Sequence, residues 1–517
     1  MHNRAHHLFD RAADCPNKVA VIFEGEHYTF AQLAELIRNT AGGLAHLGIG
    51  KATRVGIMIP SSPQFIIAQQ ALFLLGAIVT PLSIFYRPAE VAHAIESCDL
   101  EYLVIASELQ DRVAVEPSSP RSTLRSVILF DDEVSAQLPE AKPLSDAITA
   151  SRPVDRLAEV AQDDVVMLLL TSATTGKSKG VMLTAGNLAA NYDRTPSWLG
   201  LDRNSVILCA LPLYNTFGLN QCINATLMTG ATMVLLPRFD AERCIDAIDQ
   251  HRCTFVPAVP TMLQKIIDHP GARGERLSSV SKILTGGAPV PAALLGRVLA
   301  VAPKAEVLTA YGLTEGTALV TVTPVRLGDD GEVEHGRTIG RVLDGITLAI
   351  ADDNGQLVGP GEVGEIVIRG PNVMRGYHRA PKDTAIALAD GWLHSGDIGF
   401  VDNDGYVFIV DRKKDVIIRG GQNIYPADIE EVIYQVSGVA EVGVVGINDD
   451  MLGEVPIAFV ALLPGADVSI ATILERCAKE LARYKIPAQI HFLAELPKGP
   501  TGKILRRELR GLAPTAA

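Results

Sequence analysis

The feature of this sequence that most constrains its fold is a repeated alternation of short apolar strands with amphipathic helices. Strand candidates at 54–59, 78–82 and 102–106 alternate with helix candidates at 64–75 and 88–97. A second run of the same kind begins after the first 200 residues. This rhythm predicts mostly parallel sheets covered by helices, because parallel strands need a crossover connection that is usually a helix.

The length of the chain predicts more than one domain. At 517 residues it exceeds what a single hydrophobic core organises. We expect a large α/β N-terminal domain over residues 1–412, built from two βαβ-type sheets and a small β-rich subdomain at about 325–409. A small, mobile α/β lid domain would follow at 413–517.

A loop rich in hydroxyl groups, glycines and lysines follows an apolar strand. It reads LLLTSATTGKSKG over residues 168–180. Small residues let backbone N–H groups approach an anion, hydroxyl groups donate to phosphate oxygens, and lysines balance the charge. The Walker A pattern is excluded, because Gly176-Lys177-Ser178 would require glycine at position 171, which is threonine. Residues 181–184 are predicted to form another strand, so the loop is predicted to connect a hairpin. A Ser/Thr-rich surface turn is the alternative.

Composition excludes several other classes of protein. A net charge of −13 does not favour nucleic acid or an anionic membrane. The seven cysteines are scattered without a C-x-x-C pair, which indicates reduced thiols. The most apolar segment, 65–82, contains Gln69 and Gln70 and therefore predicts a buried helix and strand, with no membrane span. Without an apolar signal core or a peroxisomal C-terminal signal, we expect a cytoplasmic protein.

Two further motifs stand at the ends of predicted strands, where doubly wound sheets place ligands. They are ILTGGAP at 283–289 and YGLTEG at 311–316, followed by SGD at 395–397, DRKKD at 411–415 and PTGK at 500–503. Taken alone, YGLTEG is more often a solvated turn than a metal site, and DRKKD is more often an exposed linker.

Together and in this order, the motifs resemble those of the adenylate-forming superfamily, in its acyl-CoA synthetase branch. The resemblance covers nearly the whole chain. The phosphate loop departs from the family pattern twice, with Ala173 in place of glycine and Ser178 in place of proline. The resemblance implies a two-step reaction, in which ATP activates a carboxylic acid as an acyl-adenylate and a thiol then accepts the acyl group. ATP, Mg²⁺ and coenzyme A are the implied cofactors.

The resemblance also implies a role for each matching residue. ATP or AMP would be bound by Thr171, Ser172, Thr174, Thr175, Gly176, Lys179, Gly287, Ala288, Tyr311, Gly312, Asp397 and Arg412. The catalytic residues would be Lys503, Thr314 and Glu315, with Glu315 as the Mg²⁺ ligand. The acyl pocket would contain Tyr214, Asn215, Phe217 and Gly286, the hinge Lys414, and the CoA channel Arg419, Gly420 and Gly421.

The pocket residues predict an apolar acid, because none of them is charged. We expect a medium- or long-chain fatty acid first and an aromatic or alicyclic acid next. Asn215 stands where the family has histidine, and a helix is expected after it at 221–229.

CoA is the expected acceptor, because GGQNIYP resembles the CoA-ligase branch and the chain ends soon after Lys503. Two alternatives remain: a stand-alone acyl-AMP ligase that loads a separate acyl carrier protein, and a non-catalytic nucleotide-binding regulator. Either a monomer or a homodimer fits the sequence.

Overall fold

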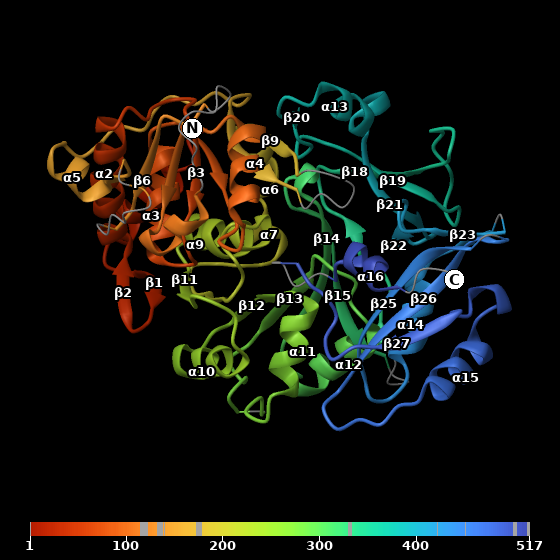
Figure 1. Cartoon of the computed structure of the whole chain (residues 1–517). Coiled ribbons are helices and arrows are strands. Elements are labelled where there is room, and N and C mark those ends of the chain that lie inside the picture. Colours follow the sequence, from red (N-terminus) through yellow and green to blue (C-terminus); the bar gives the residue numbers. More distant parts are fainter. Residues whose placement is uncertain are drawn as a thin grey trace.

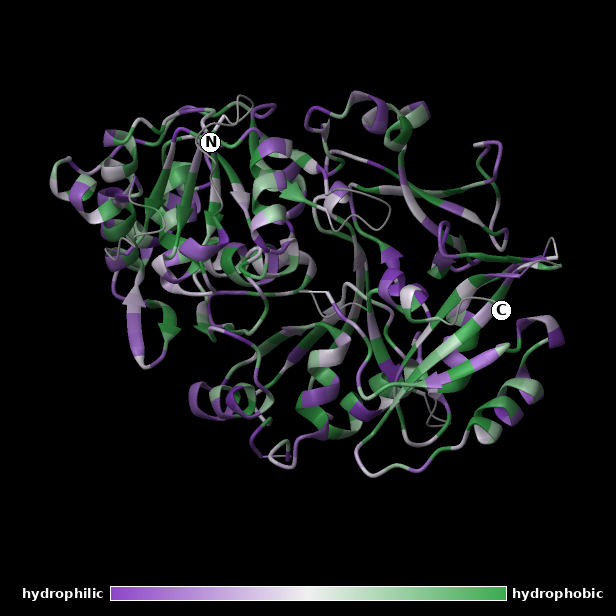
Figure 2. Cartoon of the chain, viewed as in Figure 1, coloured by the Kyte–Doolittle hydropathy of each residue, from purple (hydrophilic) through white to green (hydrophobic). Residues whose placement is uncertain are grey.

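Among the residues that the structure describes, the strands form four sheets: three end at or before Arg412, and one lies after Asp415. The structure is a computed structural model and describes residues 2–113, 123–131, 138, 140–171, 178–273, 275–328, 333–420, 422–449, 451–499 and 504–513. Figure 1 shows the C-terminal sheet, in blue, beside the larger part of the molecule. The sheet strands are largely hydrophobic, and the peripheral helices carry both polar and apolar residues (Figure 2).

The first sheet confirms the predicted βαβ run. Its described strands have the order β20-β9-β8-β4-β3-β5-β6-β7. They are β3 (Arg54–Met58), β4 (Ile78–Pro81), β5 (Tyr102–Ile105), β6 (Ser126–Leu129), β7 (Lys142–Pro143), β8 (Val165–Leu170), β9 (Gly180–Thr184) and β20 (Gly376–Tyr377). β3 pairs parallel with β4 and β5, whereas β8 and β9 are the predicted antiparallel hairpin. The phosphate loop therefore connects two neighbouring strands of this sheet.

Helices cover both faces of the first sheet. They are α1 (His6–Asp14), α2 (Phe30–His46), α3 (Pro63–Leu74), α4 (Pro88–Cys98), α5 (Leu144–Thr149) and α6 (Ala185–Asn191). Tyr102 and Val104 of β5 point into one core cluster, and Leu103 and Ile105 point into the other, as the two-residue strand period requires. The sheet is therefore buried on both sides, which explains its nearly continuous apolar strands.

The start of α2 shows how local sequence sets an element boundary. The Thr29 side chain accepts a hydrogen bond from the N–H of Gln32, and the Gln32 side chain accepts one from the N–H of Thr29. This capping box satisfies two backbone donors that the first turn leaves without a partner. The helix therefore begins at Phe30, directly after its N-cap residue Thr29.

The second sheet contains ten described strands and shares one continuous core with the first. The strands are β1 (Val19–Phe23), β2 (Glu26–Thr29), β10 (Val206–Cys209), β11 (Thr232–Leu235), β12 (Phe255–Ala258), β13 (Lys282–Gly286), β14 (Glu306–Gly312), β15 (Leu319–Leu327), β16 (Val333–Glu334) and β17 (Arg341–Val342). Its helices include α7 (Thr195–Trp198), α10 (Ala241–His251), α11 (Pro260–Asp268) and α12 (Ala292–Val301). β10 to β14 pair in parallel, and β14 then turns back into antiparallel β15.

The third sheet is small and antiparallel. Its described strands are β18 (Thr347–Ala351), β19 (Gly364–Arg369), β21 (Leu393–Val401) and β22 (Val407–Arg412), and α13 (Pro381–Ala387) lies between β20 and β21 in the chain. β21 and β22 form a hairpin whose last strand leads directly into the DRKKD segment.

The C-terminal sheet has hydrophobic clusters of its own. It contains β23 (Ile417–Arg419), β24 (Gln422–Ile424), β25 (Val439–Asp449), β26 (Gly453–Leu462) and β27 (Gln489–Phe492), with helices α14 (Pro426–Tyr434), α15 (Ile470–Glu480) and α16 (Arg506–Leu512). The domain boundary between residues 412 and 413 stays a prediction.

Arg506 of α16 joins the end of the third sheet to helix α14 of the C-terminal part. Its guanidinium lies 3.1 Å from Asp411 Oδ1 and 2.8 Å from Glu430 Oε1. Burial raises the pKa values of both carboxyl groups, although the Arg506 charge opposes that change. Removing Arg506 would leave two buried carboxylates without a cation, so the junction depends on it.

No helix among the described residues is both long enough and apolar enough to cross a bilayer.

Candidate active site

Tyr311, Asp397 and Arg412, from three different strands, meet at one point. The Tyr311 hydroxyl on β14 donates to Asp397 Oδ2 at 2.7 Å, and Arg412 Nε lies 3.0 Å from Asp397 Oδ1. Asp397 and Arg412 are register partners across β21 and β22. Burial and the neighbouring carboxylate raise the pKa of Tyr311, so its hydroxyl remains a neutral donor. Asp397 keeps lone pairs for two adjacent hydroxyl groups such as those of a ribose.

Thr314 and Glu315 lie in η3 (Thr314–Gly316), the turn between β14 and β15. Glu315 Oε1 accepts a hydrogen bond of 2.9 Å from the hydroxyl of Tyr377. Its other oxygen, Oε2, has no hydrogen-bond donor among the described residues. A single carboxylate with a free oxygen fits Mg²⁺, because this ion keeps several waters and takes further ligands from substrate phosphates. Among the described residues, no group of three or more His, Cys, Asp or Glu is placed so that it could hold a metal ion.

Two glycines of the site stand where strands approach too closely for a side chain. A Cβ atom at Gly286 would lie 2.3 Å from the carbonyl oxygen of Ala310, and one at Gly312 would lie 1.7 Å from that of Ala318. Gly287 instead has φ +77° and open space around it, next to Ala288. The carboxyl end of β13 therefore presents bare backbone, as a flat ligand surface requires.

The phosphate loop is described only at its two ends. The Thr171 N–H donates to the carbonyl oxygen of Lys179 at 3.1 Å, which closes the loop as part of the β8–β9 hairpin. Lys179 Nζ lies 2.5 Å from Asp383 Oδ1 on α13. The predicted ligands Ser172, Thr174, Thr175 and Gly176 lie outside the described residues.

The predicted acyl-pocket residues Tyr214, Asn215 and Phe217 are half-buried and close together in the chain. Burial raises the pKa of Tyr214, so its hydroxyl stays protonated. The helix expected at 221–229 begins earlier, at Thr216, so that prediction was wrong about its start.

The helix runs through α8 (Thr216–Gly218), the π-helical η2 (Leu219–Asn224) and α9 (Ala225–Thr229). It starts early because the chain folds back tightly: a Cβ at Gly218 would lie 2.3 Å from the carbonyl oxygen of Pro212. π-helical turns are rare and often occur at functional sites.

The predicted channel residues Arg419 and Gly420 make their contacts within the C-terminal part, whereas the predicted hinge residue Lys414 lies two positions from Arg412 in the chain. The Arg419 guanidinium donates to the carbonyl oxygen of Tyr484 at 2.6 Å, and the Gly420 N–H donates to that of Leu452. In Figure 1 β23, which contains Arg419, lies at the far end of the C-terminal sheet from β14. Partial burial and the Arg412 charge lower the pKa of Lys414 to about 8.

Two more predicted residues, Gly421 and Lys503, lie outside the described residues.

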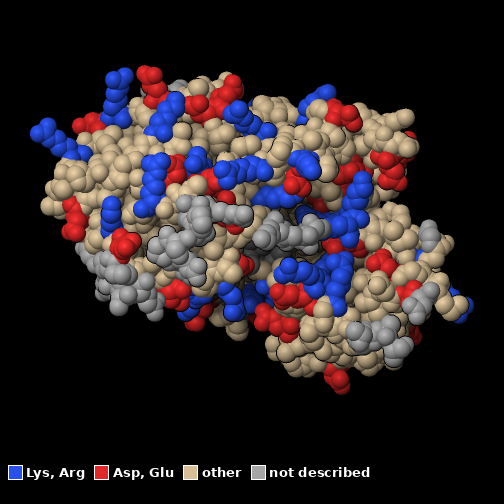
Figure 3. Space-filling view, turned by 45° about the horizontal axis from the view of Figure 1, so that its top comes forward, with Lys and Arg blue, Asp and Glu red and all other residues tan. Residues whose placement is uncertain are grey.

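Basic side chains gather around a hollow on one face of the molecule. Figure 3 shows Lys and Arg around the hollow between the larger and smaller parts of the molecule, whereas both signs are interspersed elsewhere on this face. This local concentration offsets the overall charge of −13. A cleft lined by one sign of charge attracts the opposite charge of a ligand.

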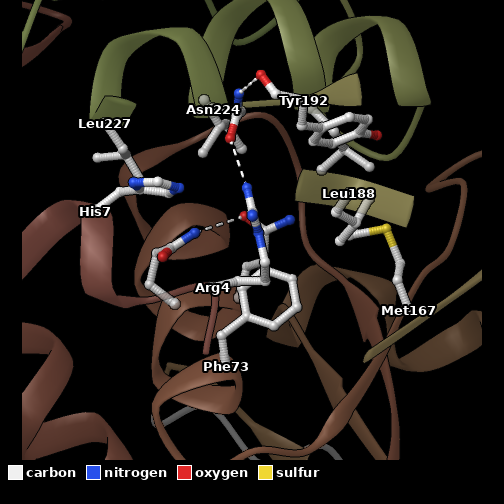
Figure 4. Close-up of a pocket in the computed structure, with 12 residues that line it drawn as sticks. Arg4, His7, Phe73, Met167, Leu188, Tyr192, Asn224 and Leu227 are labelled. Atoms are coloured by element: carbon white, nitrogen blue, oxygen red, sulfur yellow. Dashed lines mark hydrogen bonds between the residues drawn. The ribbon is translucent and has the colours of Figure 1, made fainter. Parts of the chain in front are cut away.

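A second hollow, shown in Figure 4, is too small for an acyl chain. Its volume of about 20 Å³ lies among Arg4, His7, Gln70 and Asn224, and it has room for a water molecule. Tyr192 also lines this cavity, and its hydroxyl lies 2.8 Å from Thr216 Oγ1, at the start of the helix that follows Asn215.

The sequence did not indicate Tyr377 and Asp383, which contact two predicted site residues. Both follow the third sheet's β19 in the chain and reach Glu315 and Lys179 only through the fold. The Gly376-Tyr377 pair was only a weak indication of a functional residue, since a tyrosine beside a glycine is common at strand ends.

Two ranges of the chain match known protein families. Residues 8–378 match the AMP-binding enzyme family, and residues 428–503 match the AMP-binding enzyme C-terminal domain. The chain belongs to the AMP-binding enzyme family. The predicted α/β fold, with a large N-terminal part and a small C-terminal part, is confirmed, as is the resemblance to adenylate-forming enzymes.

Other members of the AMP-binding enzyme family are similar over almost their whole length. An octahydroindenyl-propanoyl:CoA ligase of Mycobacterium tuberculosis is 35% identical, with 96% of each chain covered. The long-chain-fatty-acid–CoA ligase of Bacillus subtilis is 32% identical, with 97% of this chain and 93% of the relative covered. The crystal structure of ATP-bound MatB from Rhodopseudomonas palustris superposes with a TM-score of 0.89 at 29% identity, covering 99% of this chain and 98% of MatB.

Proposed function

We propose that this protein is an ATP-dependent carboxylic acid:CoA ligase that acts on an apolar acid. One observation carries the proposal: Tyr311, Asp397 and Arg412 converge beside the turn that holds Thr314 and Glu315. At the level of the reaction, the chain is an AMP-forming acid–thiol ligase that uses ATP, Mg²⁺ and coenzyme A. The acid and the roles of single residues are the proposed parts.

The first step joins two anions, so catalysis consists mainly of positioning and charge neutralisation. A carboxylate oxygen of the acid attacks the α-phosphorus of ATP, and the bond to the bridging oxygen of the β-phosphate breaks. Pyrophosphate leaves and the acyl-adenylate remains. Asp397 and Arg412 would hold the ribose, Tyr311 the purine, and Thr314 the α-phosphate.

Glu315 would hold Mg²⁺, which supplies charge neutralisation at the phosphates when bound. Lys179 and the loop hydroxyls would grip the β- and γ-phosphates, and Lys503 would approach the α-phosphate from the C-terminal part. A lid that excludes water protects the acyl-adenylate from hydrolysis.

In the second step a thiolate attacks the acyl carbon, and the bond to the AMP oxygen breaks. We place the lid at residues 413–517, with Lys414 as its hinge. Rotation about this hinge would withdraw Lys503 and bring Arg419, Gly420 and Gly421 to the acyl-adenylate. In the structure β23 lies at the far end of the C-terminal sheet from β14 (Figure 1). This position supports the assignment of the observed arrangement of the C-terminal part to the first step.

The proposed acid is a medium- or long-chain fatty acid, with an aromatic or alicyclic acid as the next choice. Tyr214, Phe217 and Gly286 offer apolar surface without a charge. A CoA ligase for a long-chain fatty acid and one for a bicyclic propanoyl acid are both close in sequence, which supports either choice. A separate acyl carrier protein as acceptor is the second candidate, and a cytoplasmic monomer or homodimer completes the proposal.

Release of AMP from ATP tests the function directly. Purified protein is incubated with Mg²⁺, ATP and each member of a panel of fatty, aromatic and alicyclic acids, with and without CoA. We expect AMP release that requires both one class of acid and CoA. Lys503→Ala is expected to abolish pyrophosphate release with that acid.

Two other outcomes would redirect the proposal. Pyrophosphate release with no turnover of CoA would favour a carrier protein as the acceptor. An absence of any acid-dependent signal, from a protein that still binds ATP, would favour the non-catalytic regulator.

A further inference from the structure

Residues 371–377, which we call the strap, connect the two halves of the proposed nucleotide site. On one side the strap is fastened to the elements that follow the phosphate loop. Asn187 of α6 donates from Nδ2 to the carbonyl oxygens of Pro371 at 2.7 Å and Val373 at 2.8 Å. The end of the strap is β20, which pairs antiparallel with β9. The position of the strap is therefore set by the strand that leaves the phosphate loop.

On its other side the strap binds three consecutive residues of the Glu315 turn. The Met374 N–H donates to the carbonyl oxygen of Glu315 at 2.8 Å. The buried amide of Asn372 donates to the carbonyl oxygen of Gly316 at 3.1 Å. The hydroxyl of Thr317 donates back to the carbonyl oxygen of Asn372. The backbone of the turn is therefore held at three successive positions.

Thr317 adopts a backbone conformation that β-branched residues rarely have. Its φ of +71° and ψ of −40° lie near the strained γ-turn region. Such a conformation persists only where the surrounding contacts over-determine it. Here Thr216 Oγ1 donates to the Thr317 carbonyl oxygen at 2.9 Å, and the strap holds the Thr317 hydroxyl. The chain directly after Glu315 therefore has one well-defined path.

Tyr377, the last residue of the strap, contacts both halves of the site with one side chain. Its hydroxyl donates to Glu315 Oε1 at 2.9 Å. Its ring centroid lies 5.2 Å from Lys179 Nζ, within the range of a cation–π contact. A hydrogen bond to one carboxylate oxygen restricts the rotation of the group and leaves the other oxygen directed away from the donor.

We propose that Tyr377 is a positioning residue that orients the Glu315 carboxylate toward the metal–nucleotide complex, and that the strap couples this orientation to the phosphate loop. The proposal rests on the proposed function, because it presupposes that Glu315 ligates the metal when ATP is bound. Tyr377 itself touches neither the metal nor the substrate in this assignment. Its effect reaches the reaction through Glu315.

Tyr377→Phe isolates the hydroxyl, because phenylalanine keeps the ring beside Lys179. We expect this variant, in complex with α,β-methylene-ATP, to bind Mn²⁺ about 10-fold more weakly than the wild type, as loss of an outer partner of a metal ligand does. Mn²⁺ replaces Mg²⁺ as the probe because both prefer oxygen ligands. Free Mn²⁺ is measured by electron paramagnetic resonance. The Mg²⁺ concentration for half-maximal pyrophosphate release should rise by the same factor, while KM for the acid stays unchanged.

Tyr406→Phe is the matched control, since the Tyr406 hydroxyl faces an exposed His335 at 3.3 Å, in a different hairpin. It should bind Mn²⁺ as the wild type does. A second pair of variants tests the strap. Thr317→Val lacks the hydroxyl that donates to the Asn372 carbonyl oxygen and should bind Mn²⁺ more weakly. Thr317→Ser keeps a hydroxyl and should bind Mn²⁺ as the wild type does. Thermal unfolding confirms that each variant is folded.

Two results would overturn the proposal. One is that Tyr377→Phe binds Mn²⁺ with the affinity of the wild type. The other is that Tyr377→Phe and Tyr406→Phe lose the same amount of Mn²⁺ affinity. The failure of the proposed function would look different, because the wild type itself would then show no acid-dependent pyrophosphate release.

Discussion

Lys179 Nζ lies 2.5 Å from Asp383 Oδ1. The lysine proposed to bind the phosphates of ATP therefore already forms an ion pair with a carboxylate of the protein. The two side chains are 40% and 44% exposed. An ion pair with that much solvent contact contributes little to stability, about 0–1 kcal/mol. Its consequence is competition, because ATP must displace Asp383 to reach Lys179.

Asp383→Asn should therefore lower the KM for ATP by about 3-fold, which corresponds to an exposed ion pair of under 1 kcal/mol. The free energy of unfolding should stay within about 0.5 kcal/mol of the wild type. Initial rates at varied ATP concentration measure the effect, and added salt should reduce it. Asp390→Asn, on the loop that follows α13, is the control, and an equal KM in both variants would contradict the prediction.

Asp397→Asn should raise the KM for ATP by roughly 10- to 100-fold. The substitution replaces the carboxylate proposed to bind the ribose with a neutral amide, and hydrogen bonds to charged groups contribute about 1.5–3 kcal/mol. The change also leaves the Arg412 guanidinium without its anion, 3.0 Å away. Titration calorimetry with ATP measures the loss of affinity. Asp402→Asn, in the exposed turn of the same hairpin, should bind ATP normally. Normal ATP binding by Asp397→Asn would remove the residue from the nucleotide site.

Gly286→Ala should destabilise the fold by about 1–3 kcal/mol, the usual cost of overpacking. The added Cβ would lie 2.3 Å from a backbone oxygen that cannot move without disturbing β14. Gly296→Ala is a sharp control, because Gly296 lies inside α12 with its nearest contact at 3.4 Å. Alanine there should be neutral or stabilising by up to about 1 kcal/mol. Urea unfolding of both variants gives the comparison, and similar stabilities would contradict it.

Asp193 should contribute stability that depends on pH. Arg4 Nη1 donates to Asp193 Oδ2 at 2.9 Å, and His7 Nε2 lies 3.1 Å from Oδ1. Burial alone would raise the pKa of Asp193, but these hydrogen bonds and the Arg4 charge outweigh it and hold the pKa well below the usual 3.8. A carboxyl group with a depressed pKa stabilises the folded state above its unfolded pKa, and this contribution is lost as the pH falls through the folded value.

Asp193→Asn should therefore lower the free energy of unfolding by roughly 2–4 kcal/mol at neutral pH. The difference from the wild type should shrink as the pH falls below about 4. Denaturant unfolding at several pH values measures it. Asp155→Asn, whose side chain is 84% exposed, should show no difference at any pH. A constant deficit for Asp193→Asn down to the lowest accessible pH would contradict the linkage.

Much of the local structure could be predicted from the sequence. Local sequence patterns predict the Thr29–Gln32 capping box, the β8–β9 hairpin and the strand-to-glycine segments at Gly286 and Gly312. Each depends on neighbouring residues and on backbone sterics, which the sequence contains directly. The start of the helix at Thr216 could not be predicted, because it depends on the close approach of Gly218 to the backbone at Pro212.

By itself, the sequence determined the secondary-structure rhythm, the family and the presence of Asp397, Arg412, Tyr311 and Glu315, because periodicity and motifs are local properties. Only the tertiary structure decided that β1 joins β11 in the second sheet and that β20 joins β9 in the first. It also decided that Tyr377 contacts Glu315 and that Asp383 contacts Lys179. Those pairings join segments about 60 to 210 residues apart, and the packing of the whole core selects among the partners that any one segment could accept.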